Sequence, residues 1–370
     1  MPKSALSPAS KQVLAGVVAD VQSLVGPGRP VDIELIGAAV RGWSVNTRRA
    51  FASDLVLWGQ WCRSQGVPPS AADARTVAAW VRALAGIDAS SWTIRAMATI
   101  ERYCVHVGWA YRMTGLADPT AAPLVKLEKK AARKQLGVAP RQARAIRYKG
   151  DIADLDSPAA GVCLAHLLLA CRRDLMGLRD AALLRVAYDS GCRRSELVGI
   201  ELRHIEEADG EGSLLLPKSK TDQERQGAYA YLSRATMAAI ARWQDEAGIE
   251  KGPLFRRVRT HFDGSVLGVG DTPLHANSIS PIYRRLIRAA YAKKLLGAMS
   301  EAEMERWVAA VSSHSIRVGV AQDSIAANEG LPAIMQAYRW RDPKTVLRYG
   351  ARLAARNGAS ARLAARFADD

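Results

Sequence analysis

The stretch HSIRVG, residues 314–319, decides how this sequence is read. It follows a serine pair, Ser312 and Ser313, and serine before a helical run is a common N-cap. A helix that begins here turns His314 and Arg317, three positions apart, toward the same side. Two hydrogen-bond donors that converge at a helix start suit an anion, but such pairs also occur in solvated or structural helices. The choice between these interpretations depends on the rest of the chain.

The composition indicates a globular chain with a polyanionic partner. The chain has 370 residues, of which 49% are hydrophobic, enough for two packed domains. Its formal net charge of +16 favours nucleic acid or an acidic membrane surface as the partner. The apolar stretch 161–170 is too short to cross a membrane, and the first residues lack the apolar core of a signal peptide. We therefore expect a cytoplasmic protein without a membrane anchor.

The cysteines indicate neither a disulfide framework nor a metal site. There are five of them, an odd number, and no two are spaced as Cys-x-x-Cys. Free thiols in a reducing compartment explain this usage, and we expect no bound metal.

The first part of the chain shows helical periodicity without strand signals. Residues 1–34 are expected to form a flexible lead, with a short helix before GPGRP (26–30). Four helical patterns follow, at 46–66, 70–86, 90–109 and 119–137. They predict an all-helical domain over residues 35–140.

A basic run follows the last of these helical patterns. Nine bases between positions 126 and 149 face a single acid, Glu128; they are Lys126, Lys129, Lys130, Arg133, Lys134, Arg141, Arg144, Arg147 and Lys149. A solvated linker is the simplest account of such a run, and residues 141–151 are expected to form it. In a chain this basic we favour the alternative that the run contacts a phosphate backbone.

Residues 152–370 predict a mainly helical domain with a small antiparallel sheet. The pattern at 178–191 is apolar around most of a helix, so this helix is expected to be buried. An apolar strand, a charged turn and an alternating strand at 212–232 predict a β-hairpin. Further helices are expected at 234–247, 278–296 and 301–311, the last with a Ser-x-x-Glu capping box. The chain contains no Gly-rich nucleotide loop.

Three further places contain polar residues that packing alone explains poorly. GCRRSEL (191–197) ends the buried helix, so Arg193 or Glu196 is expected to be half-buried. The simplest role of Glu196 would be that of an ion-pair partner for the arginine. KSKTDQ (218–223) places two lysines in the hairpin turn, where exposed lysine is ordinary. RWRDPKTVLRYG (339–350) places Trp340 nine residues before Tyr349, and an aromatic near a helix end is usually a packing residue.

Taken in order, these motifs resemble those of the tyrosine recombinase (phage integrase) family. The likeness rests on Gly-Cys-Arg-Arg-Ser-Glu-Leu, a lysine in a β-turn, His-x-x-Arg, and Trp and Tyr nine apart. The stretches HSIRVGVAQD and PAIMQAYRW add to it. It covers about residues 35–367, weakly over the N-terminal helices and strongly from 178 onward. Each motif alone is weak, whereas all of them in family order are specific.

The resemblance implies a two-domain clamp around duplex DNA, with a helical core-binding domain and a catalytic domain at 152–370. It implies that Arg193 and Arg317 hold the scissile phosphate and that Tyr349 is the nucleophile. Lys220 then protonates the 5′-oxygen that leaves. Planar guanidinium groups suit this task, because the pentacoordinate phosphorane carries extra negative charge that fixed donors must meet.

Three supporting roles follow from the same resemblance. Glu196 supports the neighbouring arginine. His314 donates to the phosphate oxygens or accepts the tyrosine proton. Trp340, which stands where many relatives have a second histidine, offers an indole N–H donor that cannot act as a base.

Two of these assignments have a close competitor in the sequence. Lys218 lies two residues before Lys220, and Arg194 adjoins Arg193. We choose Lys220 because Ser-Lys-Thr matches the family turn better, and Arg193 because it precedes Ser-Glu-Leu.

The implied chemistry needs no cofactor, because a covalent phosphotyrosyl intermediate conserves the bond energy without ATP or a metal.

The implied partners are a double-stranded DNA site, expected to be two inverted repeats around a spacer, and other copies of the chain. The chain is expected to be a monomer or dimer when it is free or bound to a single DNA site, and a homotetramer when it is bound to two DNA sites. A short helix at 359–368, after Asn357-Gly358, is expected to swap between subunits; the alternative is that it folds back on its own domain.

Sequence recognition is expected in two places. The first is the helical domain, through Thr47, Arg48 and Arg49 at one helix start and Arg95 on another helix, together with the bases of the helix at 119–137. The second lies in the catalytic domain, where long donors can reach guanine edges or phosphates; its residues are Arg257, Arg259 and Arg284.

Two alternatives compete with a recombinase. A type IB topoisomerase shares the chemistry but acts on one duplex as a monomer, whereas the roughly twenty residues after Tyr349 favour a subunit-swapping recombinase. A DNA-binding regulator with a degenerate site is disfavoured because every catalytic position is filled.

Overall fold

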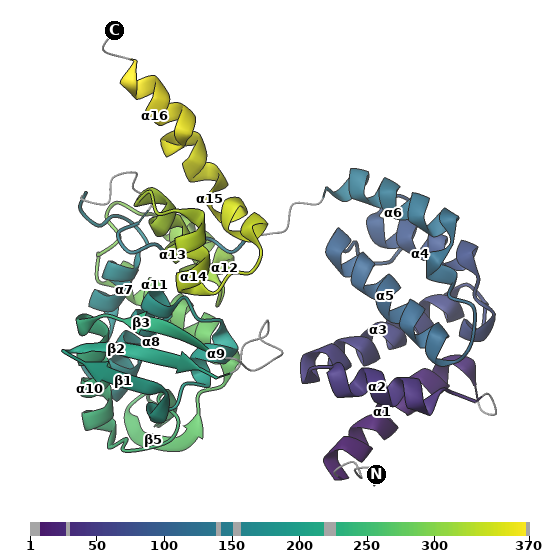
Figure 1. Cartoon of the computed structure of the whole chain (residues 1–370), viewed down its shortest axis with the longest axis horizontal. Helices are drawn as coiled ribbons and strands as arrows, with labels where there is room; N and C mark the ends of the chain where they lie inside the picture. Colours follow the sequence, from purple (N-terminus) through teal and green to yellow (C-terminus); the bar gives the residue numbers. More distant parts are fainter. Residues whose placement is uncertain (1–7, 27–29, 138–141, 151–156, 218–226, 368–370) are drawn as a thin grey trace. The chain divides into compact units, whose positions relative to one another are not determined.

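The computed structural model describes residues 8–26, 30–137, 142–150, 157–217 and 227–367. The chain forms two compact units, unit 1 (Met1–Arg141) and unit 2 (Gln142–Asp370). Helices dominate both units, and the strands form small antiparallel sheets in unit 2 (Figure 1). This confirms the predicted fold class, mainly α with a small antiparallel sheet.

Unit 1 is a bundle of six helices around an aromatic core. The helices are α1 (Pro8–Val25), α2 (Ile33–Gly42), α3 (Val45–Ser64), α4 (Ala74–Ala85), α5 (Met97–Met113) and α6 (Pro123–Leu136). Asp32, Ser44 and Asp73 cap α2, α3 and α4 by accepting backbone N–H groups. Trp58 and Trp80 are fully buried, with their ring centroids 4.9 Å apart. The core therefore rests on large aromatic side chains at helical spacing.

Two expectations for unit 1 are wrong. Val17, Val21 and Leu24 of α1 are buried in the aromatic core, so this helix belongs to the folded unit and is not part of a flexible lead. The helix expected at 90–109 begins only at Met97. Arg95 therefore lies in the connection before α5, where its backbone N–H donates to the Leu84 carbonyl at 2.8 Å.

Unit 2 contains the remaining elements. The helices are α7 (Leu164–Ala170), α8 (Leu175–Ser190), α9 (Arg194–Val198), α10 (Arg234–Ala247), α11 (Ile279–Ala292), α12 (Glu301–Ala310), α13 (Ser315–Ala326), α14 (Leu331–Tyr338), α15 (Pro343–Asn357) and α16 (Ala359–Arg366). The strands are β1 (Ile205–Ala208), β2 (Glu211–Leu216), β3 (Ala228–Leu232), β4 (Arg256–Thr260) and β5 (Val266–Pro273). In chain order, α7 to α9 precede the β1-β2-β3 sheet, α10 separates it from the β4–β5 hairpin, and helices follow again.

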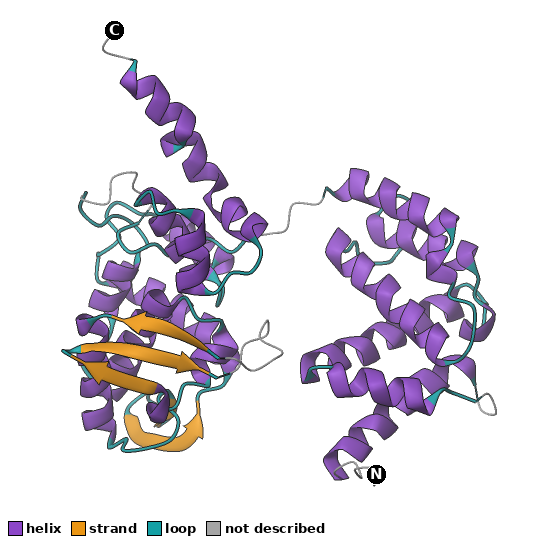
Figure 2. Ribbon diagram, viewed as in Figure 1, coloured by secondary structure: helices purple, strands orange, loops and turns teal. Residues whose placement is uncertain are grey.

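The three-stranded sheet β1-β2-β3 packs on α8 and α10 (Figure 2). Side chains alternate along β2, and Leu214 and Leu216 are buried opposite Ala230 and Ala228 of β3. This is the predicted hairpin. Its turn, with Lys218 and Lys220, lies outside the described residues. The sequence did not predict β1, or the β4–β5 hairpin.

The segment 142–150 belongs to unit 2, so the predicted linker is wrong for these residues. Ile146 is fully buried, and its backbone N–H donates to the Ser315 carbonyl at 2.9 Å. The buried Arg147 guanidinium donates from Nε to the Asp323 carboxylate at 2.6 Å. A buried apolar residue and an internal ion pair attach this segment to α13, although its composition predicts a solvated linker.

Candidate active site

The end of α8 positions Arg193 and Glu196. Gly191 ends that helix in the left-handed conformation, with φ of 56°, and a Cβ atom there would lie 2.8 Å from the Tyr338 ring. After this turn, Arg193 caps α9. Glu196 accepts the backbone N–H of Arg193 at 2.9 Å and its Nη1–H at 2.7 Å. Glu196 is buried and the Arg193 side chain is 19% exposed. This agrees with the prediction that at least one of the two residues is half-buried.

Arg317 lies on α13 and is only 4% exposed. Its guanidinium donates to the carbonyl of Gly191 and, at 2.9 Å, to that of Tyr338. Burial and the neighbouring Arg193 lower the pKa of Arg317 to about 10, so the group stays cationic at neutral pH. One buried arginine thus joins the loop after α8 to the end of α14.

The start of α13 differs from the expectation. The helix begins at Ser315, and His314 is the N-cap residue, so neither Ser312 nor Ser313 caps it. Ser312 instead accepts the backbone N–H of His314 at 3.2 Å, which closes a short turn before the helix. The His314 side chain is exposed whereas Arg317 is buried.

Trp340, between α14 and α15, contacts Tyr349 of α15. Their ring centroids are 6.2 Å apart in an edge-to-face arrangement, and the Arg317 guanidinium lies 4.5 Å from the centroid of Trp340. Gly350 lets α15 approach α13, because a Cβ atom there would lie 2.3 Å from Ile325. The tyrosine-bearing helix is therefore packed close to the helix that carries Arg317.

These contacts bring five of the predicted site residues into one cluster: Arg193, Glu196, Arg317, Trp340 and Tyr349. His314 lies at the start of the helix that carries Arg317. Lys220 falls outside the described residues, so its position relative to the cluster stays a prediction.

Sequence reasoning missed one member of this cluster, Arg339. Its guanidinium, 9% exposed, donates to the Ser190 carbonyl at 3.0 Å and lies 3.7 Å from the Glu196 carboxylate. Arg339 ends α14 with φ of 59°, a left-handed conformation that costs an L residue about 1–2 kcal/mol. The only sequence signal was an arginine at a helix end where glycine is usual.

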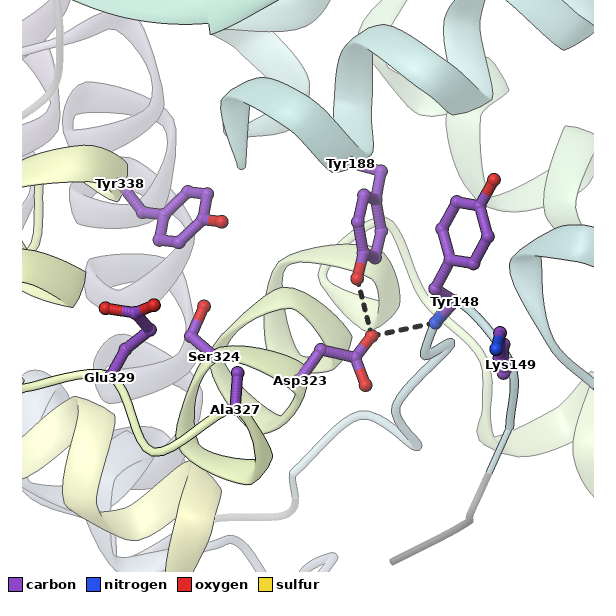
Figure 3. A pocket seen from close by; sticks show the side chains of 8 residues that line it. All are labelled: Tyr148, Lys149, Tyr188, Asp323, Ser324, Ala327, Glu329 and Tyr338. Carbon is purple, nitrogen blue, oxygen red and sulfur yellow. Dashed lines mark hydrogen bonds between the residues drawn. The ribbon is translucent and has the colours of Figure 1, made fainter. Parts of the chain in front are cut away.

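Unit 2 contains a cavity of about 380 Å³ that is lined by three tyrosines, Tyr148, Tyr188 and Tyr338, among others (Figure 3). At its edge, one Asp323 oxygen accepts the Tyr188 hydroxyl at 2.7 Å and the Tyr148 backbone N–H at 2.8 Å. Asp323 therefore connects α13 to α8 and to segment 142–150.

The residues expected to contact DNA in unit 1 lie on its surface or near it. Thr47, Arg48 and Arg49 occupy the first turn of α3, and Thr47 hydrogen-bonds Ser44. Arg95 is half-buried, and its Nε–H has no hydrogen-bond partner among the described residues. Along α6, Lys129 is half-buried and four bases are exposed, namely Lys126, Lys130, Arg133 and Lys134. Of these, Arg133 is paired with Glu101.

The three arginines expected to contact DNA in unit 2 are not equivalent. Arg257 and Arg259 are exposed on the same face of β4, with the buried Val258 between them. Arg284 is half-buried on α11 and donates to the Val311 carbonyl at 3.3 Å. Arg284 thus has a packing role that the sequence did not indicate.

Within the described ranges, no helix is long and apolar enough to cross a membrane. The same ranges contain no cluster of three or more His, Cys, Asp or Glu side chains that could hold a metal ion.

Comparison with known proteins places the chain in a family. The model of the phage integrase family matches residues 164–356, slightly more than half of the chain. Recombinase Cre of Escherichia phage P1 is 25% identical over 331 residues, covering 87% of this chain and 89% of Cre. An integrase/recombinase XerD homolog of Selenomonas ruminantium is 26% identical over 311 residues, covering 82% of this chain and 81% of that protein.

The fold agrees with these sequence matches. The structure of XerH site-specific recombinase bound to palindromic difH substrate, a post-cleavage complex, aligns with a TM-score of 0.56 and 11% identity. The alignment covers 97% of this chain and 98% of that one. The chain therefore belongs to the phage integrase family, the family of the tyrosine recombinases.

Proposed function

We propose that this protein is a site-specific DNA recombinase that cleaves and rejoins duplex DNA through a covalent 3′-phosphotyrosyl intermediate and exchanges strands through a Holliday junction. The observation that carries the proposal is the convergence of Arg193, Arg317, Trp340 and Tyr349 from three distant segments of unit 2. A tyrosine beside a cluster of buried cations suits attack on a phosphodiester.

In this proposal Arg193 and Arg317 neutralise the charge that develops on the phosphorane. Both arginines are held in place before DNA binds, by Glu196 and by two backbone carbonyls. Preorganised donors lower a barrier more than mobile ones, because they need no reorganisation during the reaction. Tyr349 supplies the nucleophilic oxygen, and the 5′-oxygen leaves with a proton from Lys220.

Two residues assist these steps. His314, exposed at the start of α13, accepts the tyrosine proton or donates to a phosphate oxygen. Trp340 donates from its indole N–H to the phosphate, and its face packs against the Arg317 guanidinium. The phosphotyrosyl bond retains the energy of the cleaved linkage, so strand exchange proceeds without ATP, a metal or another cofactor.

The proposed partner is double-stranded DNA, contacted by both units. The net charge of +16 and the exposed bases of α6 and β4 support this partner. Arg257 and Arg259 are better placed than Arg284 to reach DNA, because they are exposed and the guanidinium of Arg284 is engaged with a carbonyl. We expect phosphate contacts from Lys126, Lys130 and Lys134, and base or phosphate contacts from Thr47, Arg48, Arg49 and Arg95.

The proposed assembly is a cyclic tetramer on two DNA sites, linked by α16. Helix α15 ends at Asn357 and α16 begins at Ala359, where the Asn-Gly pair predicted a break. In Figure 1 α16 extends beyond α15, away from the other helices of unit 2, and Leu363 and Phe367 are 55% and 63% exposed. A fold-back onto its own unit would bury this apolar pair, whereas a neighbouring copy can cover it.

A plasmid assay separates this function from the topoisomerase alternative, which the recombinase relatives already disfavour. Two copies of the preferred target, selected from DNA that the protein traps covalently, are placed in direct repeat on a supercoiled plasmid. The proposal predicts deletion of the intervening segment, also in the presence of EDTA. Relaxation of supercoils without deletion, on plasmids with or without the target, would support a topoisomerase instead.

A further inference from the structure

Arg339 occupies a backbone position where an arginine is unfavourable. It ends α14 in the left-handed conformation, with φ of 59°. Glycine adopts this conformation without steric cost, so an arginine there needs a compensating interaction. The compensation lies in its guanidinium.

That guanidinium joins two parts of the active site. Arg339 immediately precedes Trp340, on the segment that leads to Tyr349. Its Nη2–H donates to the Ser190 carbonyl at 3.0 Å, at the end of the helix that precedes Arg193. The same nitrogen lies 3.7 Å from Glu196 Oε2, the oxygen that accepts the backbone N–H of Arg193. Arg339 therefore connects the segment that carries Tyr349 to Glu196, the residue that holds Arg193 in place.

The charges of the cluster are not balanced by the protein itself. Within the described ranges, the ion pairs of Arg193 and Arg339 both lead to Glu196, and the side chain of Arg317 is hydrogen-bonded only to carbonyls. The Nε–H and Nη1–H groups of Arg339 are buried without a hydrogen-bond partner in the same ranges. A buried cluster with excess positive charge is arranged for an anion, which the proposed function identifies as the scissile phosphate held by Arg193 and Arg317.

We infer that Arg339 is a positioning residue of the phosphate site, which locks the segment carrying Trp340 and Tyr349 to the loop carrying Arg193 through Glu196 and the Ser190 carbonyl. This inference rests on the proposed function. It assigns to Arg339 alignment of the nucleophile with the phosphate clamp, and no contact with DNA, because its Nη2–H is engaged with the Ser190 carbonyl beside Glu196.

The test compares Arg339→Gly, Arg339→Lys and Arg341→Gly in the full-length chain. Arg341 is an exposed arginine in the same loop, so its replacement controls for loss of one positive charge near the site. Three quantities are measured: the single-turnover rate of covalent adduct formation at saturating target DNA, the affinity for that DNA, and the melting temperature.

The inference predicts that Arg339→Gly melts no lower than the wild type, because glycine relieves the backbone strain. Its affinity should stay within about twofold, whereas adduct formation should slow by about 10- to 100-fold, as expected for a misaligned reacting group. Arg339→Lys should also be slow, because lysine keeps the charge but lacks the guanidinium fork. Ethylguanidinium added at millimolar concentration should restore part of the rate of Arg339→Gly and leave Arg341→Gly unchanged.

Two results would overturn the inference. One is wild-type adduct formation by Arg339→Gly, which would make the side chain dispensable for alignment. The other is a parallel loss of melting temperature and rate without rescue, which would make Arg339 a structural anchor only. A wild-type chain that forms no adduct would instead contradict the proposed function, so the two failures are distinguishable.

Discussion

At the scale of single residues, the candidate site is distinguished by arginines that are buried or half-buried in the fold. Arg317 is the clearest case, because its guanidinium is buried and donates to the carbonyls of Gly191, after α8, and Tyr338, at the end of α14. Burial makes each remaining interaction with a phosphate stronger than it would be in water. It also makes the residue part of the folded structure, so rate and stability are expected to change together when it is removed.

We predict that Arg317→Ala slows adduct formation by about 100- to 1,000-fold, as for a removed oxyanion donor worth ~3–4 kcal/mol. The free energy of unfolding should fall by about 1–3 kcal/mol, because the Gly191 and Tyr338 carbonyls lose their donor. Single-turnover kinetics and denaturant titration measure the two effects. Arg193→Ala, whose side chain is more exposed, should lose a similar rate with a smaller loss of stability; near-normal cleavage by either variant would contradict the clamp.

At the scale of secondary-structure elements, α13 is the central element of unit 2. It carries Arg317, contacts α8 and α15, and receives segment 142–150 along one side. Gly319 makes that last contact possible, because a Cβ atom there would lie 1.9 Å from the Ile146 carbonyl oxygen. A helix packed this closely against its neighbours has little freedom to shift, which suits the phosphate-binding role proposed for Arg317.

Gly319→Ala should therefore destabilise unit 2 by about 1–3 kcal/mol, since the backbone of segment 142–150 must move away. The matched control is Gly330→Ala, where the nearest atom would lie 3.9 Å from the new Cβ. Denaturant unfolding of both variants provides the measurement. Equal stability of the two would show that segment 142–150 adapts freely, against the tight packing described here.

Helix α6 offers a second comparison at this scale. Lys130 is exposed, whereas the charge of Arg133 on the same helix is paired with Glu101. If α6 contacts the phosphate backbone, Lys130→Gln should weaken binding to all DNA sequences and reduce the salt slope by about one unit. Arg133→Gln should have a smaller effect. Salt-dependent affinity measurements decide, and a larger effect for Arg133 would place the interface on the other side of α6.

Elements with a strong periodic pattern were predictable from the sequence, and those without one were not. Helices α3 to α6 of unit 1 and the β2–β3 hairpin followed from apolar spacing and caps, whereas α2 was not predicted. Strand β4 reads Arg-Arg-Val-Arg-Thr with one buried residue, and β5 contains two glycines, so neither matched a strand pattern. Segment 142–150 was misread because its charge concealed one buried apolar residue and one internal ion pair.

At the scale of the whole molecule, two folded units and an exposed C-terminal helix fit a protein that works as an assembly on DNA. Helix α16 continues beyond the end of α15 (Figure 1) and leaves Leu363 and Phe367 exposed. So short a helix is unstable in water by itself, which favours a partner that covers this pair. In the proposed tetramer that partner is the neighbouring copy.

Deletion of residues 359–370 should leave the melting temperature and the binding to a single DNA site nearly unchanged. Synapsis of two sites and recombination should be lost, because the head-to-tail contacts that close the ring are missing. Gel-shift and plasmid deletion assays measure these outcomes. Normal recombination by the truncated chain, or a loss of folded stability as a monomer, would refute the exchange of α16.

The residues of the candidate site could be predicted where they belong to motifs that occur in a recognisable order along the chain. The motifs located Arg193, Glu196, Arg317, Trp340 and Tyr349, which the fold brings together. Arg339 escaped prediction because its role depends on a left-handed backbone and on tertiary contacts with the end of α8, neither of which a local pattern encodes. In the proposed function one residue of this cluster, Tyr349, is the nucleophile that becomes linked to DNA.

Covalent trapping at Tyr349 tests that claim most directly. The protein is incubated with fragmented duplex DNA in the presence of EDTA and denatured with SDS; the adduct is then digested, and the modified peptide and its attached DNA are sequenced. We predict a 3′-phosphate linked to Tyr349, one preferred DNA sequence, and no adduct with Tyr349→Phe, which should still bind that sequence. An adduct that persists in Tyr349→Phe, or one linked to Tyr338, would contradict the account.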